Sequence, residues 1–450
     1  MVALLLAAAC GEQVRQVAPP TDRFYFPTGI AVRTLANGKT AVLVASSNFD
    51  LNYDAINGGT LIAIDPDASG DTRLDPNAPL AVLGSARIGS MGGEVAVLDA
   101  ESCPGWTPPA GVPAAQVLIP SRSLDALYQV TLDETTGAVT CGAGCELPLD
   151  VSLHSDGSAL ADPYGVTLAC RQVDGTARFT AFVSYLRSAS FDGFLTEVDL
   201  TAPAAQTRIA LGTNYSFSSA YDDLTGRLFV TSGFVGAGSA PLRWVDLAGG
   251  YAVSSSSLYD VVRGSETRGI GLSNPRAGVD RRAYVALRIY DADTAASLGM
   301  RPSADVAGAL AVIQLTEEPW GEPSARVARV IPLDRGATQV KVLPPRTGKG
   351  DLVAVTSPDD NSMTLYDDDS GNVARTFALD AGGNPELGKQ PFGMAVEQRH
   401  GVTCAGSSAP LASCDRIYVG SFDRGFVSVV ELDPDHPAGA AVVKRVGRER

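Results

Sequence analysis

The sequence predicts an all-β protein, a seven-bladed β-propeller of four-stranded antiparallel blades. The main observation is a unit of three short strands that recurs seven times between residues 24 and 446. A weaker fourth strand follows several of these units, and four strands per repeat is typical of a propeller, whose radial closure protects the sheet edges. No segment carries a long apolar period of 3.6 residues, which excludes an α/β solenoid.

The repeated unit is clearest near the C-terminus. Its first strand opens at Gln390-Pro391-Phe392-Gly393, its second covers residues 416–421 and its third covers residues 426–433. Asp423 and Gly425 supply the turn between the second and third strands. The unit is therefore a first strand after Pro-x-Gly, a second strand ending in Ser, and a third strand ending in Asp.

The other six units follow one another along the chain. Their first, second and third strands are expected at 26–32, 40–46 and 59–65; 94–98, 116–121 and 126–133; 162–168, 179–184 and 193–200; 216–220, 227–232 and 242–247; 268–272, 282–287 and 308–313; and 338–342, 351–357 and 362–367. Outer fourth strands are expected at 207–210, 326–331, 373–379 and 441–446.

Composition excludes several classes of function. The 450 residues include 35 basic and 50 acidic side chains, a net charge of −15, and such a field repels nucleic acid and anionic lipid. The three histidines lie outside the predicted inner strands, so a histidine-based metal site or acid/base pair is poorly supplied. No P-loop, Gly-x-Ser-x-Gly or His-Glu-x-x-His motif is present.

The N-terminus resembles a bacterial lipoprotein signal. Residues 1–10 form a short apolar run that ends in small residues and Cys10, the residue expected to be lipidated. The run lacks a basic start and is shorter than a usual signal, so we interpret it as a truncated signal peptide. The alternative is an apolar tail with a chance cysteine. Residues 11–23 are then a tether, and residues 24–450 a single propeller domain in an exported, lipid-anchored protein of the bacterial cell envelope, at the outer membrane or on the periplasmic face.

The remaining six cysteines predict disulfides, because an exported chain meets an oxidising compartment. Cys404 and Cys414 bracket a hairpin-like insertion and are the expected pair. Spacing leaves three pairings open for the other four, Cys103, Cys141, Cys145 and Cys170. A zinc site at Cys141-x3-Cys145 is the alternative, although only His154 lies near enough in sequence to help complete it.

The repeated motifs resemble the seven-bladed propeller family with Tyr-Val-Thr-Asn-type repeats. The similarity covers nearly all of residues 24–446 and rests on Pro-x-Gly followed by an apolar strand and on tetrapeptides such as Phe229-Val230-Thr231-Ser232 and Tyr418-Val419-Gly420-Ser421. These tetrapeptides depart from the family's own, which weakens assignment to a subfamily. The resemblance implies the fold, while the activities of such propellers vary.

The loops after the second strands carry the candidate ligand residues. On a propeller they would lie on one face beside the channel, where carboxylates could ring a funnel and bind a cation or polar ligand. The alternative is that each Asp caps its own turn by accepting backbone N–H groups. The aspartates are Asp50, Asp125, Asp192, Asp360 and Asp423, with Arg122, Arg187 and Arg424 nearby.

Two further motifs have a structural and a functional interpretation. Asp65, Asp67, Ser69 and Asp71 resemble the first half of a calcium loop, but Pro76 stands where a bidentate Glu belongs, so a solvated turn is the alternative. Calcium is the one cofactor that any motif suggests. The glycines of the opening strands, Gly29, Gly165, Gly269 and Gly393, are expected to pack closely around the channel instead of binding a ligand.

Two function classes follow. The first is a non-catalytic binding or scaffold module, monomeric and held at the membrane only by its lipid anchor, with a protein or glycan partner in the cell envelope. The alternative is a lactonase- or lyase-like propeller enzyme that uses Asp192, Asp423 and Arg424 in the funnel. Several convergent carboxylates with a metal would favour the enzyme, whereas a channel plugged by apolar side chains would favour the binding module.

Overall fold

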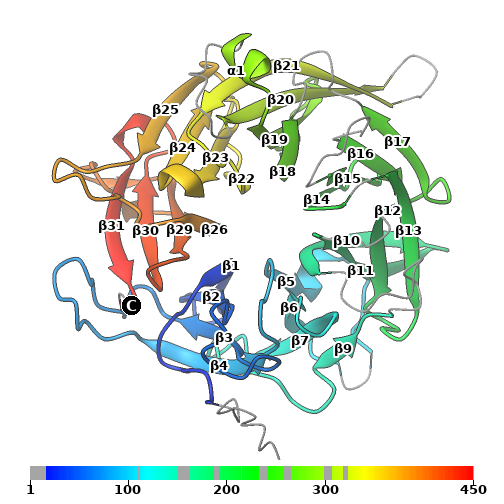
Figure 1. The fold of residues 1–450 in the computed structure, drawn as a ribbon, viewed down its shortest axis with the longest axis horizontal. Coiled ribbons are helices and arrows are strands. Elements are labelled where there is room, and N and C mark those ends of the chain that lie inside the picture. Colours follow the sequence, from blue (N-terminus) through cyan, green and yellow to red (C-terminus); the bar gives the residue numbers. More distant parts are fainter. Residues whose placement is uncertain are drawn as a thin grey trace, which may run out of the picture.

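The computed structural model describes residues 17–109, 112–150, 162–186, 192–213, 215–232, 242–256, 265–297, 307–317 and 323–448. Apart from one two-stranded hairpin, their strands form seven antiparallel sheets arranged around a central axis, and the chain runs once around the ring (Figure 1). In each sheet the first strand lies nearest the axis and later strands follow outwards. The predicted seven-bladed β-propeller of four-stranded antiparallel blades is confirmed.

Five blades have four strands in strict sequence order. Blade 1 contains β1 (Pro27–Thr34), β2 (Thr40–Ser46), β3 (Gly59–Ile64) and β4 (Val82–Ile88); blade 3 contains β10 (Pro163–Val173), β11 (Thr176–Tyr185), β12 (Asp192–Asp199) and β13 (Gln206–Thr213). Blade 4 contains β14 (Ser219–Asp222), β15 (Arg227–Thr231), β16 (Leu242–Asp246) and β17 (Ala252–Ser256); blade 5 contains β18 (Ser265–Leu272), β19 (Arg281–Ile289), β20 (Ala307–Glu317) and β21 (Pro323–Leu333); blade 6 contains β22 (Val340–Val342), β23 (Leu352–Ser357), β24 (Ser362–Asp367) and β25 (Asn372–Phe377).

Blades 2 and 7 carry additions to this plan. In blade 2 two short strands, β8 and β9, share the outer position beside β7, and in blade 7 the hairpin β27–β28 is inserted between the first two strands. Blade 2 contains β5 (Ala96–Asp99), β6 (Ala115–Ser121), β7 (Ala126–Leu132), β8 (Val139–Thr140) and β9 (Glu146–Pro148); blade 7 contains β26 (Pro391–Arg399), β29 (Cys414–Ser421), β30 (Phe426–Leu432) and β31 (Ala441–Val446), with β27 (Val402–Thr403) and β28 (Pro410–Leu411). Among the described residues the short helices are η1 (Ala100–Ser102), α1 (Ala292–Ser297), η3 (Pro358–Asp360) and η4 (Pro437–Gly439).

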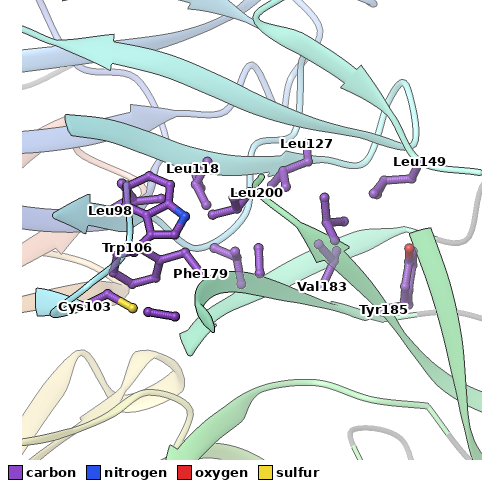
Figure 2. Close-up of a cluster of buried hydrophobic side chains, with 14 of the residues drawn as sticks. Leu98, Cys103, Trp106, Leu118, Leu127, Leu149, Phe179, Val183, Tyr185 and Leu200 are labelled. Carbon is purple, nitrogen blue, oxygen red and sulfur yellow. The ribbon is translucent and has the colours of Figure 1, made fainter. Parts of the chain in front are cut away.

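The hydrophobic core is divided among the spaces between neighbouring blades. Over the described residues, seven buried apolar clusters occur, one at each junction between adjacent sheets. Figure 2 shows the cluster between blades 2 and 3, where Trp106 packs edge-on against Phe179 with their ring centres 5.0 Å apart. Each blade thus buries both faces against its neighbours, which is why the strands are apolar on both sides.

The ring closes through packing, hydrogen bonds and ion pairs between the first and last blades, because each blade is built from one continuous stretch of chain. β1 and β26 meet at the axis, and their blades share a buried cluster that includes Ile30 and Tyr418. Outside this cluster Arg416 of blade 7 forms an ion pair of 2.7 Å with Asp67 of blade 1. Closure therefore depends on how well the two terminal blades fit.

The described residues contain three disulfides. Cys404, directly after β27, is joined as predicted to Cys414, the first residue of β29. Cys103 is joined to Cys170, which links blade 2 to blade 3, and Cys141 is joined to Cys145. The last pair places both sulfurs of the alternative zinc site in a disulfide. Nowhere in the described part of the chain is there a helix long and apolar enough to cross a membrane.

Candidate functional site

The first strands of four blades begin in the same unusual way. Phe26, Asp162 and Gln390, each directly before its inner strand, have positive φ angles of 46°, 57° and 51°, and Met91, five residues before β5, has a φ angle of 57°. Non-glycine residues rarely adopt this conformation. In each case the carbonyl oxygen accepts a hydrogen bond of 3.0–3.3 Å from the N–H of a residue directly after the second strand. The bond ties the loops after the second strands to the inner strands on one face, which we call the mouth face.

A register shift follows directly in three of these strands and also in blade 5. The pairing slips between Pro27 and Gly29, Pro163 and Val166, Thr267 and Ile270, and Pro391 and Met394. Such a bulge turns the side chains beyond it relative to regular alternation. When the seven first strands are aligned by their pairing with the second strands, two successive positions correspond in all seven blades. We call the earlier residue the mouth position and the later residue the axis position. The axis position is occupied by Gly29, Glu94, Gly165, Ser218, Gly269, Gln339 and Gly393.

The glycines at the axis position are packed against the backbone of the next blade. A Cβ atom would lie 2.4 Å from the Gly93 carbonyl oxygen if placed on Gly29, and 2.4 Å from the Thr28 carbonyl oxygen if placed on Gly393. On Gly269 it would lie 2.5 Å from the Thr338 carbonyl oxygen. Real side chains do not fit at these distances, so the close packing predicted for the opening glycines is confirmed.

The three axis residues that are not glycine form one hydrogen-bonded cluster. Glu94 Oε1 accepts bonds from Ser218 Oγ at 3.3 Å and from Gln339 Nε2 at 3.1 Å. Gln339 Nε2 also lies 3.3 Å from the hydroxyl of Tyr164, which accepts from it. Burial raises the pKa of the Glu94 carboxyl, and Lys341 and the hydrogen bonds only partly offset this. Side chains from blades 2, 4 and 6 thus fill the axis that the glycines leave open.

Above this cluster, on the mouth face, lies a cavity of about 290 Å³. Six residues at the mouth position line it, and its rim is completed by the loops after the second strands and by Arg288 of β19. The mouth-position residues are Thr28, Tyr164, Phe217, Arg268, Thr338 and Phe392, and the rim includes Phe49, Arg122, Leu186, Arg288, Pro358, Asp359 and Phe422. We call this cavity the channel mouth.

Aromatic rings form a connected series around the channel mouth. Phe422 contacts Phe49 with ring centres 5.1 Å apart and Phe392 with ring centres 6.0 Å apart. Tyr164 continues the series, 6.4 Å from Phe392 and 5.0 Å from Phe217. The rings give the cavity an apolar wall on the side of blades 7, 1, 3 and 4.

Three arginines supply the polar part of the wall. Arg268 lies over the ring of Phe217 at 4.7 Å and forms an ion pair with Glu266. Arg122 is 3.3 Å from Asp162 and 5.8 Å from the centre of the Phe49 ring. The Arg288 guanidinium donates to Thr338 Oγ1 at 2.8 Å, and its distance to Asp359 is 3.8 Å, at the limit of an ion pair. A ligand anion could therefore compete for these guanidinium groups.

Of the predicted ligand residues whose side chains are described, Arg122 lines the cavity, whereas Asp50, Asp125, Asp360, Asp423 and Arg424 lie in the expected loops but not in the cavity wall. In three loops the residue before the predicted aspartate lines the channel mouth: Phe49 before Asp50, Asp359 before Asp360 and Phe422 before Asp423. Asp125 is buried at the β6–β7 turn, Arg424 is half-buried beside exposed Asp423, and Asp192 begins β12. The Asp192 side chain and Arg187 lie outside the described residues.

Two of these aspartates do bond within their own loops or to a neighbouring loop. Asp50 accepts hydrogen bonds from Asn52, as the turn-capping alternative expects. Asp360 accepts from the backbone and guanidinium of Arg335, both at 2.7 Å. Although partial burial opposes it, this pairing holds the pKa of Asp360 below its usual value.

The residues of the calcium-like loop bind protein groups. Asp65 accepts from the N–H groups of Asp67 and Ala68 and from Lys39, whereas Asp67 pairs with Arg416 and Asp71 pairs with Arg73. Ser69 Oγ donates to the Asp65 carbonyl oxygen at 2.7 Å. These contacts are those of a turn held by ion pairs.

One group of three potential metal ligands comes within 4.8 Å among the described side chains. It consists of Cys404, Cys414 and Glu431. The two sulfurs are bonded to each other, so the group offers a metal only the carboxylate.

Comparison with known proteins adds support for the fold. No family model matches the chain, and no curated protein matches it. Among solved structures, hydrazine synthase from Kuenenia stuttgartiensis is similar with a TM-score of 0.53 and 12% identity, over 91% of this chain and 96% of that one. The β-propeller domain of Cps50 (Swd1) from Myceliophteria thermophila has a TM-score of 0.48 and 11% identity, over 91% of this chain and 98% of that domain. At 12% identity the likeness to hydrazine synthase concerns the fold alone.

Proposed function

We propose that this protein is a lipid-anchored cell-envelope protein whose propeller is a non-catalytic binding module, and that the channel mouth is its binding site. The observation that carries the proposal is the cavity of about 290 Å³ whose floor is occupied by Tyr164 and the Glu94 cluster. A concave site with an apolar wall and a few placed polar groups is typical of ligand binding.

The lining indicates the chemistry of the ligand. Arg122 and Arg288 hold their acidic neighbours at 3.3 Å and 3.8 Å, so an incoming carboxylate or phosphate can be bound at little cost. Phe392 and Phe422 offer ring faces beside them. The site thus suits an anionic group attached to a ring or apolar body, such as an acidic sugar of a glycan or an acidic–aromatic segment of an envelope protein.

The experiment is a titration of the full chain with acidic and neutral oligosaccharides and with acidic–aromatic peptides, followed by calorimetry. Phe392→Ala and Arg122→Ala are each expected to weaken binding about tenfold or more, as for an aromatic or arginine anchor. Leu74→Ala is the control, because Leu74 is 85% exposed in the β3–β4 loop on the opposite face. Binding that both mouth variants leave unchanged would exclude the channel mouth.

The proposed anchor is tested separately by mass. Protein extracted in detergent from its own membrane should carry a lipid on Cys10 and three disulfides when its denatured mass is measured. An unmodified Cys10 would remove the anchor from the proposal and leave the binding site to the titration.

The enzyme alternative retains one observation. The carboxyl group of Glu94 lies beneath the channel mouth with a pKa raised by burial, as a general acid requires. Asp423 and Arg424 do not line the channel mouth, and the Asp192 side chain lies outside the described residues. Turnover of a lactone by the wild-type chain and its loss in Glu94→Gln would favour the enzyme over the binding module.

A further inference from the structure

Blade 1 presents exposed apolar side chains on the mouth face. They lie on residues 47–58, the connection from β2 to β3, which we call the rim loop. Phe49, Leu51 and Ile56 are 37%, 45% and 50% exposed. The described N-terminal segment adds Val17, which is 46% exposed and whose carbonyl oxygen accepts a bond of 3.3 Å from the Asp54 N–H.

Hydrogen bonds hold the rim loop in place. Asn48 bridges it, donating to the Asp54 carbonyl oxygen at 2.8 Å and accepting from the Tyr53 N–H at 3.1 Å. The Ile56 carbonyl oxygen accepts from Ser90 N–H at 2.7 Å, in the connection between blades 1 and 2, and from Ser123 Oγ at 3.1 Å, in blade 2. The backbone is thus satisfied by the protein, while the apolar side chains project outwards at a cost that a partner surface would remove.

The position of Val17 relates the rim loop to the proposed anchor. Seven residue steps separate Cys10 from Val17, so the chain between them can span at most about 25 Å. β1 alone has eight residues and is about 26 Å long, before the loops on either end of the blade are added. Because Val17 lies on the mouth face and the tether is shorter than the blade is thick, a lipid on Cys10 brings the mouth face to the membrane before the opposite face.

We infer that the rim loop docks on the lipid bilayer, with Phe49, Leu51 and Ile56 in contact with its interface, so that the channel mouth opens towards the membrane. This inference rests on the proposed lipid anchor. It narrows the partner of the channel mouth to a molecule displayed at the membrane surface.

Charge indicates what kind of contact this is. The chain carries a net charge of −15, and the rim loop itself contains Asp50 and Asp54. Anionic lipids would repel such a surface, so the contact must draw on apolar burial and needs no anionic headgroup. Binding should accordingly be at least as strong on phosphatidylcholine as on phosphatidylglycerol, and insensitive to salt.

The experiment uses the acylated full chain reconstituted on phosphatidylcholine vesicles, with lipidation first verified by mass. Hydrogen exchange of residues 47–58 should slow on vesicles compared with detergent-free protein lacking the lipid, while the β3–β4 loop around Leu74 stays unchanged. Acylated protein whose rim loop exchanges equally fast on vesicles would overturn the docking and leave the anchor standing. A Cys10 without lipid would overturn both.

A double variant sharpens the test. Leu51 has φ of 53°, which Asn tolerates better than other non-glycine residues, so Leu51→Asn with Ile56→Ser should fold normally. The non-acylated double variant should bind vesicles about 25-fold more weakly than the non-acylated parent, about fivefold for each half-exposed side chain. Leu74→Ser with Leu224→Ser, on exposed residues of the opposite face, is the matched control and should bind like the parent. Equal losses in both variants would contradict the inference.

Discussion

The mouth position and the axis position are adjacent in sequence, yet the first accommodates large side chains and the second mostly excludes them. At the axis position four of seven residues are glycine, and the backbones of neighbouring blades approach too closely for a side chain. At the mouth position the lining side chains range from Thr28 to Arg268 and Phe392. Glycine recurs at the axis position because there is no room for a side chain, whereas the residue at the mouth position varies because its side chain faces the cavity. The position that varies is the one that a ligand can reach.

Glu94 shows how the axis accommodates an exception. It stands in the glycine position of blade 2, and its carboxylate is bonded to Ser218 and Gln339, the other two exceptions. Three larger residues thus replace three glycines together, at alternate blades, and satisfy one another. A single large residue without the other two would lack these partners.

The largest loss of stability is expected when a side chain is added to a glycine at the axis position. In Gly393→Ala the added Cβ would lie 2.4 Å from the Thr28 carbonyl oxygen, which is backbone and cannot turn away. Because this contact joins the first and last blades, we expect unfolding to become easier by about 3 kcal/mol, as in severe overpacking. Chemical denaturation measures the loss. Gly439→Ala is the control, since nothing lies within 4 Å of the added atom; equal losses in the two variants would contradict the argument.

A second prediction concerns the carboxyl group at the axis. Since burial raises the pKa of Glu94 in the folded state, its protonated form is favoured there. The group costs nothing below the unfolded pKa of about 4.3, and stability is lost as the pH rises through the folded pKa. The loss is about 1.4 kcal/mol for each pH unit that separates the folded pKa from the unfolded pKa. Glu94→Gln should therefore melt at a higher temperature than the parent at pH 7.

The pH dependence provides the check on Glu94. The difference in melting temperature between Glu94→Gln and the parent should vanish near pH 4. Asp415 serves as a comparison away from the axis, because burial raises its pKa to about 6, so Asp415→Asn should show the same sign. A Glu94→Gln protein less stable than the parent at pH 7 would mean that Lys341 and the hydrogen bonds outweigh burial.

The smallest effect on stability is expected at the mouth position. Phe392 is half-buried and touches Phe422 and Tyr164, so Phe392→Ala should cost about 1 kcal/mol, far less than the change at its neighbour Gly393. The same variant is expected to lose ligand binding. Chemical denaturation and ligand titration of the same Phe392→Ala preparation measure the loss of stability and the loss of binding. A loss of stability as large as that of Gly393→Ala would contradict the proposed difference between the mouth position and the axis position.

The architecture was predictable because its cause is local and repeated. Pro-x-Gly, a second strand ending in Ser and a third ending in Asp recur along the chain, and each copy predicts the same strands. The outer strand expected at 441–446 coincides with β31. Cys404 and Cys414 are only ten residues apart around a hairpin, so their pairing was also accessible from spacing.

The candidate site was predictable only to the level of its loops. The sequence predicts ligand residues in the loops after the second strands, and five of these loops do border the channel mouth. Arg122 lines it as predicted, but in three loops the lining residue is the neighbour of the predicted aspartate: Phe49, Asp359 and Phe422. Which residue of such a loop faces the axis depends on the bond to a positive-φ residue and on the bulge beside it. Neither feature follows from alternation along one strand. An alignment of the units at their glycine would, however, have singled out Glu94.

By itself the sequence determined the repeat, its strands and the need for glycine at the axis, because these depend on turns, period-two patterns and steric room within each unit. Only the tertiary structure decided what meets at the centre. Cys103 pairs with Cys170 across 67 residues, and Glu94, Ser218 and Gln339 converge from three blades, because ring closure brings together positions that are equivalent in structure but far apart along the chain.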